Sequence, residues 1–119
     1  SRHIYFGPWS QLKASDRPLV LSEFGGYACP IEGHIFNPDK AYGYKACPSV
    51  ADFRVQIETL YRKRILPVVK KGLCAAIMTQ VSDVEDEING FLTYDRAVCK
   101  GDAASMLAIA QELQKEIEE

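Results

Sequence analysis

One carboxylate in this sequence lies where a catalytic group would be expected. Glu23 closely follows the apolar run Leu19-Val20-Leu21, and Phe24 and two glycines come directly after it. A continuous apolar run is typical of a strand that is buried on both faces of a parallel sheet. The carboxyl ends of such strands carry the reactive groups in α/β folds. The pattern makes Glu23 a candidate nucleophile, against the alternative of a solvated loop residue.

A second set of polar side chains follows the next apolar run, residues 73–79. If the two runs are parallel strands, their polar groups meet at one rim of the sheet. Gln80 comes first, and an acidic stretch follows it, which could be a hard-metal site, a second catalytic carboxylate or a solvated loop that touches a ligand. The third interpretation is favoured, because the spacing does not match an EF-hand loop. The acidic residues are Asp83, Glu85, Asp86 and Glu87.

The segments around these runs predict the elements that hold them in place. Residues 49–71 show the three- and four-residue apolar spacing of an amphipathic helix, with Ser49 or Asp52 as its cap and Pro67 as a kink. Asp102 precedes a second helical pattern that continues to the end of the chain. The order β-α-β-α predicts two βα units with parallel strands, and Asn89-Gly90 predicts a tight turn.

A long irregular segment, residues 27–49, separates the first strand from its helix. Loops of this length in a compact domain are usually functional lids or rims. Tyr27 could contact a sugar or a neighbouring domain. Trp9, near the start of the chain, could stack on a sugar face or cap the core, and capping is the favoured interpretation.

The composition excludes several functional classes. The chain has 119 residues, 47% hydrophobic and 25% charged, which is typical of one globular domain. A net charge of -2 without a basic stripe argues against a nucleic-acid partner. No apolar window is long enough to cross a bilayer, and the first residues lack a signal-peptide core, so we expect a cytoplasmic protein with no membrane partner. The chain does not begin with Met, which favours a piece of a longer protein.

The cysteines and histidines predict neither a metal site nor a cofactor. The four cysteines lack the spacing of a zinc or redox motif, and four free thiols are favoured over a Cys29–Cys47 disulfide. Cys74 lies in an apolar run and is expected to be buried. His3 and His34 are far apart in the sequence, and neither lies near a cysteine.

The predicted elements do not make a closed structure. Two parallel strands cannot bury the helical stripes and sheet edges that this sequence presents. A complete (β/α)₈ barrel takes about 250 residues, so residues 1–119 fit the C-terminal end of one. We therefore expect unprotected strand edges, exposed apolar surface and self-association of the isolated chain.

Four blocks of sequence resemble the C-terminal part of the catalytic barrel of family-two glycoside hydrolases, the β-galactosidase and β-glucuronidase group. They are Leu19-Val20-Leu21-Ser22-Glu23-Phe24-Gly25-Gly26, the run from Gly72 to Gln80, the run from Asp83 to Gly90, and Leu92-Thr93-Tyr94-Asp95-Arg96. The likeness covers nearly the whole chain.

The resemblance implies that Glu23 is the nucleophile of a retaining glycosidase, at the end of the seventh barrel strand, with residues 73–79 as the eighth. In that mechanism the nucleophile forms a glycosyl-enzyme while a second carboxylic acid protonates the leaving oxygen of a β-glycoside. The family carries this acid in an Asn-Glu pair on an earlier strand. Asn37 and Asn89 precede Pro38 and Gly90 here, so the isolated chain is expected to be inactive.

The chain departs from the family at the end of the eighth strand. Many members have a tryptophan there that lines the sugar pocket, whereas this chain has Met78-Thr79-Gln80. Gln80 could hydrogen-bond a sugar hydroxyl. The alternative hypothesis is a non-catalytic α/β module that binds carbohydrate or protein.

Overall fold

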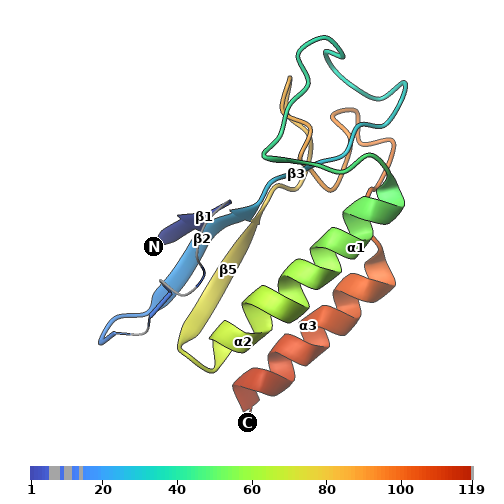
Figure 1. Ribbon diagram of the computed structural model, residues 1–119. Coiled ribbons are helices and arrows are strands. Elements are labelled where there is room, and N and C mark those ends of the chain that lie inside the picture. The colour runs from blue at the N-terminus through green and yellow to red at the C-terminus, as the bar shows by residue number, and fades with distance from the viewer. Residues whose placement is uncertain (6–8, 10–11, 14, 119) are drawn as a thin grey trace.

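The computed structural model describes residues 1–5, 9, 12–13 and 15–118. A parallel sheet of three strands in the order β1-β2-β5 forms one layer, and helices pack against one of its faces (Figure 1). The strands are β1 (Arg2–Ile4), β2 (Leu19–Gly25) and β5 (Leu73–Thr79). The chain is therefore an α/β protein with parallel strands, as the sequence predicts.

Strand β2 lies at the centre of the sheet. Its Leu21 and Phe24 are fully buried, whereas Leu19 and Val20 are only partly buried, so the apolar run is not buried on both faces as expected. Gly25 of β2 pairs with Thr79 of β5, and His3 of β1 pairs with Glu23. The expectation that both predicted strands have unprotected edges was wrong for β2, because β1 covers the edge that β5 leaves free.

The first helical segment runs from Val50 to Val69 in three consecutive parts. They are α1 (Val50–Leu60), the π-helical turn η2 (Tyr61–Ile65) and α2 (Leu66–Val69). Ser49 caps the start, since its side chain accepts a hydrogen bond from the Asp52 amide at 3.1 Å. Pro67 lies in the first turn of α2, directly after η2, and it has no N–H to donate to the preceding turn. The predicted irregularity near Pro67 thus takes the form of a wider turn before it.

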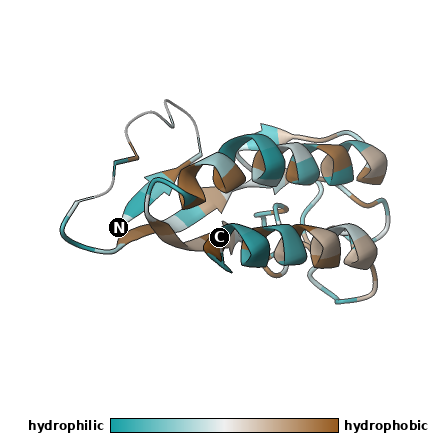
Figure 2. Ribbon diagram, turned by 90° about the horizontal axis from the view of Figure 1, so that it is seen from below, coloured by the Kyte–Doolittle hydropathy of each residue, from teal (hydrophilic) through white to brown (hydrophobic). Residues whose placement is uncertain are grey.

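The last helix, α3 (Ala103–Glu118), lies beside α1 and α2 in both ribbon views (Figures 1 and 2). Asp102 caps it by accepting a hydrogen bond from the Ser105 amide at 3.2 Å. Arg62 connects the two helices, donating to Glu112 from Nη2 at 2.8 Å. Figure 2 shows hydrophilic and hydrophobic residues alternating along both helices, the pattern of helices with one buried face.

Two loops meet beyond the carboxyl ends of the strands (Figure 1). The first, residues 27–49, is not wholly irregular, because β3 (Tyr27–Ala28) and β4 (Lys45–Ala46) pair in parallel within it. Backbone hydrogen bonds join it to the loop after β5. The amide of Tyr42 donates to Asp86, and the amide of Ile88 donates to Tyr42, both at 2.8 Å.

Two local expectations, on a turn and on the burial of Cys74, were wrong, and the expectation of free cysteines was confirmed. The tight turn predicted at Asn89-Gly90 lies instead between Val84 and Glu87, whose backbones exchange two hydrogen bonds of 3.0 Å. Cys74 is exposed rather than buried, at a point where the pairing register of β5 with β2 shifts. All four cysteines are free, as the sequence favours. Within the described residues, every helix is too short or too polar to cross a lipid bilayer.

Candidate active site

Glu23 lies near the carboxyl end of the central strand. The side chains of His3, in β1, and Tyr5, just after β1, lie against it. The hydroxyl of Tyr5 donates to Glu23 Oε2 at 2.5 Å, and His3 Nδ1 lies 3.3 Å from the same oxygen. The Glu23 side chain is 42% exposed, so a ligand can still approach the carboxylate. A carboxylate held by one donor and open on its other side is suited to nucleophilic attack or to binding a cationic centre.

Tyr5 joins all three strands at this edge. It follows β1, bonds Glu23 on β2, and lies within hydrogen-bonding reach of the Thr79 side chain on β5. Burial and then the hydrogen bond and charge of Glu23 raise the pKa of Tyr5 to about 12. The phenol therefore stays protonated and remains a hydrogen-bond donor to Glu23 at any physiological pH.

The glycines after Glu23 allow the close approach of the surrounding rings. Gly26 has a φ of +75°, and a Cβ built on it would lie 2.5 Å from Cδ2 of Tyr44 and 2.9 Å from Cδ1 of Tyr5. Those two rings stack with their centroids 3.9 Å apart. Gly25 has a φ of +96° and contacts Met78 in the same way. Any side chain at these positions would strain the backbone, and a side chain at Gly26 would also collide with the rings of Tyr5 and Tyr44.

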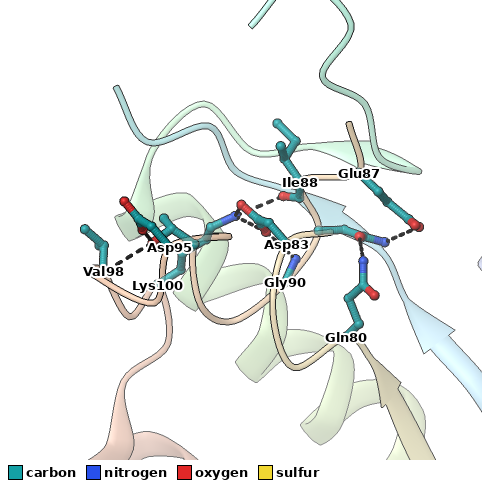
Figure 3. Close-up of polar contacts among 10 residues, drawn as sticks. Gln80, Asp83, Glu87, Ile88, Gly90, Asp95, Val98 and Lys100 are labelled. Carbon is teal, nitrogen blue, oxygen red and sulfur yellow. Dashed lines mark hydrogen bonds and ion pairs between the residues drawn. The ribbon is translucent and has the colours of Figure 1, made fainter. Parts of the chain in front are cut away.

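Gln80 begins the loop after β5 and is partly buried. Its Nε2 donates to Asn89 Oδ1 at 2.7 Å, and Asn89 Nδ2 donates to Glu87 Oε1 at 3.3 Å (Figure 3). The preceding residue, Thr79, is tied to the Glu23 strand because its carbonyl accepts a hydrogen bond from the Gly26 amide at 3.1 Å. Gln80 and Glu23 therefore belong to adjacent strand ends, as the sequence predicts.

Trp9 and Tyr27 lie together in a different part of the rim. Both line a hollow of about 240 Å³ that also includes Tyr5, Lys45 and Arg64. Tyr27 is only 5% exposed, and the Lys45 ammonium lies 5.5 Å from the centre of its ring. Trp9 packs edge-on against Phe24, with centroids 6.5 Å apart, which is the core-capping arrangement. Tyr5 lines this hollow and also donates to Glu23.

The acidic stretch divides into one buried and three surface carboxylates. Asp83 is buried and bonded to Lys100 Nζ at 2.8 and 2.9 Å, while its Oδ1 also accepts from the Gly90 amide (Figure 3). Lys100 donates a third bond to the Ile88 carbonyl at 3.0 Å. Glu85, Asp86 and Glu87 form the turn above this pair. Among the described residues, no group of three or more His, Cys, Asp or Glu side chains is arranged to hold a metal ion.

The sequence reasoning missed three of the residues around this site. In the sequence His3 is isolated from the other histidine and the cysteines, Tyr5 is expected like Trp9 to stack on a sugar face or to cap the core, and nothing singles out Lys100. His3 and Tyr5 are two residues apart, so a recognised strand would place both on one face. The strand β1 has only three residues and no apolar run, so the sequence pattern does not predict a strand there.

Comparison of this chain with protein-family models gives no match, and comparison with curated proteins gives none either. What the geometry offers chemically is one oriented, accessible carboxylate at the end of a buried strand. A neutral phenol donates to this carboxylate, and an amide side chain, Gln80, begins the loop after the adjacent strand.

Proposed function

We propose that this chain is the nucleophile-bearing end of a retaining glycosidase barrel, of the kind found in family-two glycoside hydrolases. The observation that carries the proposal is the Tyr5–Glu23 hydrogen bond of 2.5 Å at the carboxyl end of a central parallel strand. The three parallel strands with helices on one face match the arrangement of consecutive barrel strands. The proposal keeps the cytoplasmic location expected from the sequence.

In this proposal Glu23 attacks the anomeric carbon of a β-glycoside and becomes the ester-linked leaving group when water later cleaves the glycosyl-enzyme. Tyr5 holds the carboxylate in one orientation and keeps its own proton rather than transferring it to Glu23, since the phenol pKa is about 12. Water attacks the ester in the second step. The proton donor to the departing oxygen must lie about 5 to 5.5 Å from the nucleophile. The proposal assigns it to a barrel strand that precedes this chain.

Chemical rescue tests the assignment in the full-length enzyme. Glu23→Ala should abolish hydrolysis of an aryl β-glycoside, because no group remains to form the glycosyl-enzyme. Sodium azide should then restore release of the aryl group and yield the α-glycosyl azide, since a small anion fits the space left by the carboxylate. Asp86→Ala removes a nearby surface carboxylate and serves as the matched control, with activity retained.

Two outcomes would contradict the proposal. One is an unaltered rate in the Glu23→Ala enzyme. The other is azide rescue that yields the β-azide, because that product would place the nucleophile elsewhere. Saturable sugar binding by the 119-residue chain, independent of Glu23 and without turnover in the full-length protein, would favour the alternative of a binding module.

A further inference from the structure

Two buried thiols lie opposite each other where the first rim loop begins and ends. Strands β3 and β4 pair in parallel, with Ala28 opposite Ala46. The next position of this register places Cys29 opposite Cys47, and the Cys47 amide continues the ladder by donating to the Ala28 carbonyl at 2.7 Å. The ladder stops there because the following residue, Pro30, has no N–H that could donate to the Cys47 carbonyl.

This register brings the two side chains within the range of a disulfide. Neighbouring strands lie about 4.8 Å apart, and paired residues of a parallel ladder point to the same face. A disulfide joins Cα atoms that are about 4.4 to 6.8 Å apart. Cys29 is 0% exposed and Cys47 is 2% exposed, and both belong to the same apolar core cluster. A bond between the two sulfurs therefore needs little movement of either strand.

Burial keeps both thiols protonated and shielded in the folded protein. It raises the pKa of each thiol, and the charge of a Cys29 thiolate would raise the pKa of Cys47 further. The thiolate is the form that attacks an electrophile, so the buried pair should react more slowly than Cys74 and Cys99, which are exposed. Reaction of the pair then follows local opening of the loop.

A bond between the two sulfurs would close the first rim loop into a ring. The enclosed segment carries Tyr44, whose ring stacks on Tyr5 with a centroid distance of 3.9 Å. The two cysteines lie at the ends of this segment, one directly after β3 and the other directly after β4. A cross-link there would join the two strands covalently in the register that they already have.

We propose that Cys29 and Cys47 are an oxidisable pair, which a hydroperoxide converts into a disulfide across this loop. One thiolate attacks a peroxide oxygen, and the O–O bond breaks to give a sulfenic acid and an alcohol, or water from hydrogen peroxide. The second thiolate attacks the sulfenic sulfur, so the S–S bond forms and the S–O bond breaks with loss of water. The two thiols give up two electrons, the peroxide accepts them, and the two thiol protons leave in the alcohol and the water. This site goes beyond the proposed function, because no step involves Glu23.

Alkylation followed by oxidation tests the pair in the folded full-length protein. Iodoacetamide should label Cys74 and Cys99 and leave Cys29 and Cys47 as thiols, because the buried pair reacts roughly tenfold more slowly or less. Hydrogen peroxide is added after the reagent is removed, and tryptic peptides are mapped without reductant. Trypsin cleaves after Lys40, so the two buried cysteines lie on separate peptides. These peptides should be found joined, and dithiothreitol should separate them.

The Cys47→Ala variant is the matched control, since it removes one sulfur and leaves Cys29 in the same core. Its Cys29 peptide should be joined to no other peptide, and thermal unfolding checks that the variant is folded. The wild-type peptide map decides the question by itself if the variant does not fold.

Two results would overturn the inference. One is a wild-type map in which Cys29 and Cys47 both become sulfinic acids without any joined peptide, because neighbouring thiols should stop at the disulfide. The other is a pair that remains fully reduced after peroxide has been consumed by the protein's other oxidisable side chains.

Discussion

Tyr5 is the side chain through which the nucleophile candidate is held in place. Its hydroxyl donates to Glu23 at 2.5 Å, and its ring is stacked on Tyr44 at a centroid distance of 3.9 Å. The stack fixes the ring, and the ring fixes the hydroxyl, so the Glu23 carboxylate has one preferred orientation. Hydrogen bonds to charged groups contribute about 1.5 to 3 kcal/mol, enough to matter for a reacting carboxylate.

Tyr5→Phe should lower kcat/KM of the full-length enzyme roughly 10- to 100-fold, because the hydrogen bond is lost while the ring stack remains. The thermal midpoint should change little for the same reason. Steady-state kinetics on an aryl glycoside measures the effect. Tyr94→Phe removes a phenol hydroxyl from the loop between β5 and α3 and should leave the rate unchanged. An undiminished rate in Tyr5→Phe would show that the hydrogen bond has no part in catalysis.

At the residue scale, the sequence alone singles out Glu23 and Gln80, the polar residue that follows β5. An apolar run that ends at a carboxylate and two glycines carries that information locally. The partners of Glu23 could not be predicted, because the contact between Tyr5 and Glu23 joins residues 18 positions apart through sheet pairing. Lys100 is a similar case, since nothing in its neighbourhood predicts a fully buried cation.

At the scale of elements, the buried Asp83–Lys100 pair holds the loop after β5 against the rest of the rim. Lys100 is fully buried and Asp83 is 4% exposed, and each makes further bonds to the backbone of the same loop. This loop also carries Asn89 and Glu87. The pair therefore also holds Asn89, the hydrogen-bond partner of Gln80, in place.

Lys100→Met should destabilise the protein by about 3 to 5 kcal/mol, because Asp83 is left as a buried charge without a partner. Urea unfolding followed by circular dichroism measures the change. Adding Asp83→Asn to the Lys100→Met variant removes the unpaired charge and should recover part of the loss. If the free energy of unfolding of Lys100→Met lies within about 1 kcal/mol of the wild-type value, Lys100 is not a buried partner of Asp83.

The two rim loops are joined by a pH-sensitive contact. His34 Nδ1 lies 2.7 Å from Asp95 Oδ2, and the hydroxyl of Thr93 donates to Asp95 Oδ1 at 2.6 Å. The Thr93 hydrogen bond, and then that of His34, holds the pKa of Asp95 well below its usual range. A lowered pKa means that the ionised form favours the folded state, so the contribution is present above the unfolded pKa and lost as the pH falls toward the folded one.

We therefore expect the wild type to lose thermal stability relative to Asp95→Asn as the pH is lowered from about 4, the ordinary value for aspartate. Thermal unfolding at a series of pH values measures this loss, and Asp39→Asn, at an exposed aspartate of the loop that carries His34, is the control. A difference that does not change with pH would show that Asp95 is not held by these hydrogen bonds.

The elements themselves were largely predictable. Ser49 and Asp102 cap the two helices as their side-chain chemistry predicts. The tight turn predicted at Asn89-Gly90 was wrong, and the structure has one between Val84 and Glu87 instead. Asn89 and Gly90 are buried, and the Gly90 amide donates to Asp83. Composition alone cannot distinguish a turn glycine from a packing glycine.

At the scale of the molecule, the sheet has helices on one side and an open edge at β5. Ile77 in that strand is 56% exposed, and Cys74 and Ala75 beside it are also exposed. An apolar groove of about 190 Å³ runs between β5 and α3. An uncovered parallel sheet of this kind is unusual, and the proposed barrel would supply its missing neighbours.

The isolated chain should therefore self-associate through β5, as the sequence led us to expect. Light scattering should show an apparent mass that rises with concentration. Ile77→Lys should reduce this association by placing a charge on the exposed strand. Leu107→Lys introduces the same charge at a 61% exposed position on α3 and should have a smaller effect. A monomer at all concentrations would contradict the expectation.

The proposed glycosidase activity is tested most directly by covalent labelling of the full-length protein with a 2-fluoro β-glycoside, which slows hydrolysis of the glycosyl-enzyme enough for it to be isolated. Peptide mass mapping should find the 2-fluoroglycosyl group on Glu23, with an intact label on the peptide that also contains Phe24. A label on any other carboxylate, with Glu23 unmodified in an inactivated enzyme, would contradict the central claim.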